Sequence, residues 1–149
     1  VLAPNGSHEV SANVRVIFDK EKKQGLDKID TYNAFKANCE KSREDLVALL
    51  NKLKNEGKRV VGYAATSKST TILNYCGIGT EIIDFICDTT PEKIGKFSPG
   101  KHIPIKSMDY FYKNYPDVAF LFAWNHKKEI FDKEKEFSQK GKWIAHVEL

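Results

Sequence analysis

The chain has 149 residues, of which 41% are apolar and 30% charged, the size and composition of one globular domain with a single core. Apolar runs such as residues 118–124 are far shorter than the roughly 20 residues that cross a bilayer, so no membrane is expected as a partner. The net charge of +4 comes from 24 Lys and Arg against 20 Asp and Glu, and lysines alternate with acids. This pattern is typical of solvated helix faces and argues against nucleic acid as a partner.

The cysteines and the first residues indicate the compartment and the context of the chain. Cys39, Cys76 and Cys87 are far apart and odd in number, which predicts neither a zinc site nor a disulfide framework. A reducing, cytoplasmic setting is therefore expected. The sequence begins without Met and without the pattern of a signal peptide, so we interpret it as a domain of a longer protein.

The first residues are expected to lie outside the main domain. Residues 10–18 alternate between apolar and polar side chains, which predicts a β-strand. Residues 20–28 are charged and contain Gly25, which predicts a turn or linker. We therefore expect a boundary near residue 26, with a strand and linker over 1–25 and the main domain over 26–149.

Strands and helices are predicted to alternate through the main domain. Apolar residues such as Leu46, Leu50 and Leu53 recur at helical spacing before the stop at Gly57. The predicted elements, in chain order, are a helix over 29–56, a strand over 59–63, a helical segment around 72–75, a strand over 81–87, a loop over 91–104, a short helix over 108–114, a buried strand over 118–122, a charged helix over 127–140 and a strand over 143–147. This alternation predicts an α/β fold, a Rossmann-like three-layer sandwich with a mainly parallel sheet.

Ligands of such folds bind beyond the carboxyl ends of the strands, where the loop over 65–71 lies between a strand and a helix. Its small residues, hydroxyls and Lys68 suit a phosphate, although it is neither a Walker loop nor a GxGxxG fingerprint. The alternative is that Ser67, Ser69 or Thr70 merely caps the following helix.

Three further positions follow predicted strands or lie in loops. Asp88 occupies the place from which a doubly wound fold contacts a ribose hydroxyl, or it forms a turn. His102 is a hydrogen-bond donor or base, or a structural loop residue. Trp124 and Asn125 can hold a base or sugar, or serve as core aromatic and helix cap. Neither HExxH nor GxSxG is present, so no metal ligand and no catalytic residue is predicted.

Three ordered motifs resemble the C-terminal domain of S-adenosylmethionine-dependent C-methyltransferases, whose best-known members act on nucleotide-linked deoxysugars. Residues 62–79, GYAATSKSTTILNYCGIG, resemble the family's GYGAPAKGNTLLNYCGIG. Residues 88–105 are similar to its DxNPxKxGxxxPGxHIPI, and residues 124–130, WNHKKEI, to its WNxxxEI. The resemblance covers residues 26–149 and, more faintly, Asn5-Gly6-Ser7, which is similar to the family's GGS element.

The resemblance has departures in the first loop. Ala64 replaces a glycine, Thr66-Ser67-Lys68-Ser69 replaces Pro-Ala-Lys-Gly, and Thr90 replaces an Asn. The phosphate-binding role that the resemblance implies is therefore more secure for Lys68 than for Ser67 or Ser69.

The resemblance implies that residues 1–25 are the end of a preceding methyltransferase domain, which binds S-adenosylmethionine and carries the catalytic base. The chain itself is then expected to bind no cofactor, to hold a nucleotide-sugar and to transfer no methyl group when isolated. The alternative is an interaction or scaffold domain that stabilises the methyltransferase domain. A nicotinamide-dependent oxidoreductase is disfavoured because GxGxxG is missing. The expected substrate-binding residues are Ser67, Lys68, Ser69, Thr70, Asn74, Asp88, Lys93, His102, Trp124, Asn125 and Glu129.

Overall fold

The computed structural model describes residues 4–147, which divide into two compact units between Lys41 and Ser42. The first unit holds helix α1 (Ala12–Lys23) and the start of helix α2 (Ile29–Asn55). The division falls inside α2, whereas the boundary near residue 26 concerned the end of a preceding domain and stays a prediction. No helix of the described residues is long and apolar enough to cross a membrane.

The predicted strand over 10–18 is wrong, because α1 occupies most of it. Val14, Ile17 and Phe18 also fit helical spacing, and the first unit has no strand among residues 4–41 with which a strand here could pair. The Ser11 side chain caps the helix by accepting a hydrogen bond from the backbone N–H of Asn13. The helix continues to Lys23, so the predicted linker is reduced to a turn over 24–28.

The second unit is built on a parallel sheet of five strands in the order β3-β2-β1-β4-β5, which confirms the Rossmann-like prediction. The strands are β1 (Val60–Tyr63), β2 (Ile83–Cys87), β3 (Ile105–Lys106), β4 (Val118–Leu121) and β5 (Lys142–Ile144). The chain moves outward from β1 to β3 and then returns to the other side of β1. The loops after β1 and β4 therefore diverge at the topological switch point, where ligands of open α/β sheets bind.

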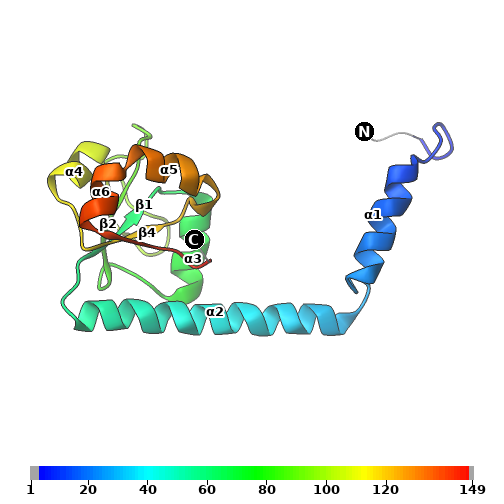
Figure 1. The fold of residues 1–149 in the computed structure, drawn as a ribbon, viewed down its shortest axis with the longest axis horizontal. Coiled ribbons are helices and arrows are strands. Elements are labelled where there is room, and N and C mark those ends of the chain that lie inside the picture. The colour runs from blue at the N-terminus through cyan, green and yellow to red at the C-terminus, as the bar shows by residue number, and fades with distance from the viewer. Residues whose placement is uncertain (1–3, 148–149) are drawn as a thin grey trace. The chain divides into compact units, whose positions relative to one another are not determined.

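Figure 1 shows helices on both sides of the sheet. Side chains alternate between the two faces of the sheet, and each face has its own core. Val60, Val118 and Phe120 face the C-terminal half of α2 and helix α3 (Ser67–Cys76). Val61 and Leu121 face the other layer. That layer consists of α4 (Met108–Lys113), α5 (Lys127–Lys133) and α6 (Lys135–Lys140).

Two elements differ from the expected pattern. The predicted helix over 127–140 is broken at Glu134 into α5 and α6, and a 3-10 turn, η1 (Trp124–His126), precedes it. The two-residue strand β3 was not predicted, because a strand that short leaves no periodic signal. The predicted loop over 91–104 is irregular as expected, with an isolated antiparallel bridge between Phe97 and Pro104.

Candidate functional site

The loop between β1 and α3 is organised by Thr66. Its hydroxyl oxygen accepts a hydrogen bond from the Ser69 backbone N–H at 3.2 Å and so caps α3. The Ser69 hydroxyl donates to the Thr66 carbonyl at 2.6 Å, and Ser69 is buried. Capping therefore does occur in this loop, but at Thr66 rather than at Ser67, Ser69 or Thr70. Ser69 is engaged inside the loop, whereas Ser67 is exposed.

Asp88 joins the loops that follow β1 and β2. Its carboxylate accepts hydrogen bonds from the backbone N–H groups of Ala65 at 2.7 Å and Thr90 at 2.8 Å. Lys93 Nζ lies 3.2 Å from the same carboxylate and also donates to the Ala65 carbonyl at 2.8 Å. Burial acts to raise the pKa of Asp88, but these hydrogen bonds outweigh it and the pKa is lowered. The geometry fits the structural alternative, because both carboxylate oxygens are already occupied.

Replacing Asp88 with Asn is expected to lower the free energy of unfolding by about 1–2 kcal/mol, because an amide offers only one acceptor oxygen to two backbone donors. Urea unfolding at pH 7 measures the loss. The exposed Asp132→Asn is the charge-matched control and should leave stability unchanged. The contribution of Asp88 is present above its ordinary pKa of 3.8 and is lost as the pH falls through its lower folded pKa. Equal stability of both variants would contradict the structural role.

Lys68, Trp124 and Asn125 meet at the topological switch point, and we call them the switch-point cluster. Lys68 Nζ donates to Asn125 Oδ1 at 2.8 Å and lies 5.8 Å from the centre of the Trp124 ring. Lys68 is in the first turn of α3, whereas the other two residues follow β4. A cation, an amide and an aromatic surface are thereby brought together from two separate sequence motifs.

His146 adjoins this cluster and was not predicted from the sequence. Its ring packs edge-on against Trp124, with ring centres 6.3 Å apart. Burial lowers the pKa of His146, and the positive charge of Lys68 lowers it further. Trp124 Nε1 and His146 Nδ1 are buried without a hydrogen-bond partner among residues 4–147. A histidine near the chain end, outside every motif, carries no sequence signal for this position.

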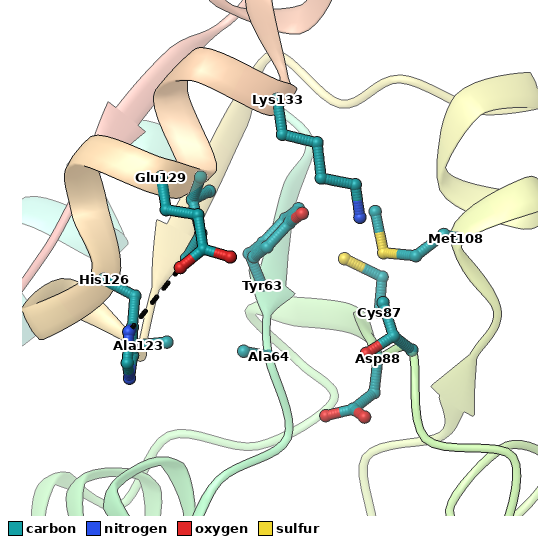
Figure 2. A pocket seen from close by; sticks show the side chains of 11 residues that line it. Tyr63, Ala64, Cys87, Asp88, Met108, Ala123, His126, Glu129 and Lys133 are labelled. Atoms are coloured by element: carbon teal, nitrogen blue, oxygen red, sulfur yellow. Dashed lines mark ion pairs between the residues drawn. The ribbon is translucent and has the colours of Figure 1, made fainter.

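A pocket of about 320 Å³ opens on the sheet face covered by α4 and α5, and its lining includes Ala123 and His126, which flank Trp124 and Asn125 in the sequence (Figure 2). His126 and Glu129 lie on one side of Tyr63, Cys87, Asp88 and Met108 lie on the other, and the Lys133 side chain reaches over to the side of Met108. Glu129 is at the mouth, where its Oε2 is 4.0 Å from His126 Nδ1. The pocket thus combines an apolar floor with a mouth of mixed charge. Its floor includes Tyr63, Cys87, Met108, Ala123 and Ile130, its mouth has the exposed His126, Glu129 and Lys133, and the buried Asp88 also lines it.

Glu134 lies buried behind this pocket and holds its floor. Its Oε1 accepts hydrogen bonds from the hydroxyls of Tyr63 at 2.7 Å and Tyr112 at 3.1 Å. Burial and the Glu134 carboxylate raise the pKa of Tyr63, and they raise the pKa of Tyr112 to about 12. In the sequence, Glu134 sits in the lysine- and glutamate-rich run over 127–140, which is indistinguishable from a solvated helix face.

The remaining predicted residues lie on the α3 side of the sheet. A second pocket, of about 350 Å³, brings Ser67, Ser69, Thr70 and Lys93 together. Asn74 Nδ2 instead donates to the Thr70 and Pro99 carbonyls, which ties α3 to the loop over 91–104.

His102 lines none of the pockets described. It is exposed, in a turn where its φ is 51°, and its backbone N–H donates to the Ser98 carbonyl. The predicted residues are thus divided among the switch-point cluster, two pockets and structural contacts, and their role in substrate binding stays a prediction.

Comparison with known proteins is consistent with the motifs and the fold. The sequence model of the family described as "C-methyltransferase C-terminal domain" matches residues 1–147. The chain is also 39% identical over 134 residues to the C-methyltransferase NovU of Streptomyces niveus. That alignment covers 90% of this chain but 32% of the relative, so the chain spans less than half of that protein's length. The resemblance drawn from the motifs is confirmed.

Proposed function

Because this chain belongs to the family of C-methyltransferase C-terminal domains, we propose that it is the substrate-binding domain of an S-adenosylmethionine-dependent methyltransferase that acts on a nucleotide-linked sugar. The observation that carries the proposal is the switch-point cluster of Lys68, Trp124 and Asn125. It lies beyond the carboxyl ends of the strands, where this fold class binds nucleotides.

The chemistry of the cluster suits such a ligand. The ammonium group of Lys68 stands in the first turn of α3, where backbone N–H groups and the helix dipole also favour an anion. A diphosphate would take the place that Asn125 Oδ1 now occupies on Lys68. Trp124 offers an apolar surface for a base or sugar ring, and the freed amide of Asn125 offers polar contacts. The pocket behind Glu129 and Lys133 lies next to this position and would receive part of the same ligand.

Two features of this domain argue against S-adenosylmethionine as its own ligand. The stretch from Tyr63 to Thr66 contains no glycine of the kind that lets a cofactor lie against the backbone, whereas the diphosphate proposed above would be held by the Lys68 side chain. Asp88, the acid in the position that contacts a ribose, has both oxygens occupied. We therefore propose that the cofactor binds to the part of the enzyme that precedes this domain, and that the isolated chain transfers no methyl group. Methyl transfer by residues 1–149 alone would contradict this.

Lys68→Ala is expected to weaken the binding of a nucleoside diphosphate by about tenfold, because a charged contact to phosphate is lost. Calorimetric titration with the diphosphates of thymidine, uridine, guanosine and cytidine measures the affinity and identifies the base. Lys113→Ala removes the same charge from an exposed position on α4 and should change nothing. Equal affinity of both variants would remove Lys68 from the site.

A second candidate is an interaction or scaffold domain whose own pocket binds no ligand. It is favoured by Ser69, Asp88 and Lys93, whose polar groups are satisfied within the domain. In that case Lys68→Ala changes no ligand affinity.

For either candidate we propose a cytoplasmic setting. It is supported by the three unpaired cysteine thiols, because reducing compartments keep thiols unpaired.

A further inference from the structure

Helix α1 exposes an apolar stripe along one side. Val14, Ile17 and Phe18 are spaced three and four residues apart, so they share one helix face, and Phe18 is 67% exposed. Within the first unit, none of the side chains of this helix is buried. An amphipathic helix of this kind gains its stability from packing its apolar face, and within the first unit that face is exposed.

The beginning of α2 repeats the feature. Ile29, Tyr32 and Phe35 follow one another at intervals of three residues and are exposed, Ile29 by 71%. The Thr31 hydroxyl donates to the Gly25 carbonyl at 2.7 Å and the Tyr32 hydroxyl to the Leu26 carbonyl at 2.6 Å, so the turn between the helices is held in place. We call these two sets of apolar residues the N-terminal stripes.

The stripes differ from the scattered apolar residues that any surface carries. Later in α2, Leu46 and Leu50 are buried against the sheet of the second unit, whereas Ile29, Tyr32 and Phe35 are exposed within the first unit. Grouped apolar side chains on a helix face mark a site for another protein surface. The second unit has two cores that are complete without the stripes.

We propose that the N-terminal stripes are the docking surface for the polypeptide that precedes this domain in the full-length methyltransferase. The inference rests on the family membership and on the multidomain enzyme proposed above. The chain aligns with 32% of its relative and belongs to a family described as a C-terminal domain, so most of such an enzyme lies on the N-terminal side. The stripes lie within residues 14–35, the part of the chain nearest in sequence to that polypeptide.

Charged substitutions on α1 test the surface. Phe18→Asp and Ile17→Asp place a carboxylate in the stripe. Burying that charge in an apolar interface without water would be costly, so docking should be lost. Val16→Asp is the matched control, because Val16 is a similarly exposed apolar residue of the same helix on the side away from the stripe. All three substitutions change helix propensity in the same direction. A difference in hydrogen exchange among the variants therefore reflects the side of α1 that is substituted, and not the stability of the helix itself.

Amide hydrogen exchange of α1, followed by mass spectrometry, is measured in the full-length enzyme and in residues 1–149. We expect exchange at least roughly tenfold slower in the full-length enzyme. Phe18→Asp and Ile17→Asp should abolish this protection, and Val16→Asp should retain it. Equal exchange in both proteins would overturn the proposal, as would equal loss in all three variants.

Protection of α1 already present in residues 1–149 would also overturn it. If that protection rises with protein concentration, the occupant is a second copy of the chain; if it does not, the stripes pack within the chain. The readout is independent of ligand binding. A full-length enzyme with protected stripes that fails to bind any nucleoside diphosphate would refute the proposed substrate role and leave the docking surface standing.

Discussion

Replacing Phe111 with Ala is expected to lower the free energy of unfolding by about 3–5 kcal/mol, the largest loss foreseen for a single substitution in this domain. Phe111 is completely buried in the core between the sheet and α4. Its ring makes edge contacts with Tyr63, Tyr115 and Phe137, with centres 5.2 to 5.6 Å apart. Truncation removes these contacts and leaves a cavity that a rigid aromatic cluster refills poorly.

Urea unfolding followed by far-UV circular dichroism measures this loss. Phe97→Ala is the matched control, because the Phe97 side chain is 62% exposed and its removal should cost less than about 1 kcal/mol. If the two variants were equally stable, the core on this face of the sheet would not be packed as described. The slope of the transition should stay unchanged, since the same surface is exposed on unfolding.

The second large effect is expected at Glu134. Glu134→Ala should lower the free energy of unfolding by about 2–3 kcal/mol, because the Tyr63 hydroxyl would be left buried without an acceptor. Tyr112 is partly exposed, and its hydroxyl can turn to water, so it adds less. The same substitution should loosen the floor of the pocket between α4 and α5, where Tyr63 lies. Ligand affinity is therefore expected to fall together with stability.

Two further variants separate the hydrogen bonds from the charge. Glu134→Gln keeps an acceptor for the Tyr63 hydroxyl and should recover most of the loss. Glu136→Ala changes an exposed neighbour that forms a surface ion pair with Lys140 and also interacts with Tyr115, and it should cost little. A Glu136→Ala variant as unstable as Glu134→Ala would show that general helix propensity, and not the buried network, is responsible.

The tyrosine pair also predicts how stability depends on alkaline pH. Both hydroxyls have folded pKa values above their ordinary value of 10.0, and that of Tyr112 is raised to about 12. The unfolded chain therefore releases these protons at lower pH than the folded protein. Their contribution to stability is full below pH 10 and declines as the pH rises through the folded pKa values. Glu134→Ala should weaken this decline, because part of the raised pKa comes from the carboxylate.

Most of the α/β framework is predictable because its signals are local. The spacing of apolar residues over 29–56 and the aliphatic strands over 59–63 and 118–122 correspond to α2, β1 and β4 within a few residues. Residues 10–18 show the limit of such reasoning. Val14 and Phe18 satisfy both a two-residue and a helical period, and only the presence or absence of a partner strand decides between them.

Part of the candidate site was predictable from the rule that ligands of open α/β sheets bind beyond the carboxyl ends of the strands. Lys68 follows the parallel strand β1, Trp124 and Asn125 follow the parallel strand β4, and the carboxyl ends of such strands meet at one edge of the sheet. The same rule does not predict that the side chains of Lys93 and Asn74 donate hydrogen bonds to backbone carbonyls of the loops. Those contacts join residues 25 or more positions apart and depend on how the loops cross.

The sequence by itself determined the class of fold, the order of most elements of the second unit and the family, because periodicity and motifs are properties of short segments. Only the tertiary structure decided that Glu134 is buried, that His146 packs on Trp124 and that the Asp88 carboxylate accepts hydrogen bonds that join two loops. Burial and pairing arise when segments far apart in the chain are brought into contact, and a charged residue looks the same in sequence whether its partner is water or a buried hydroxyl.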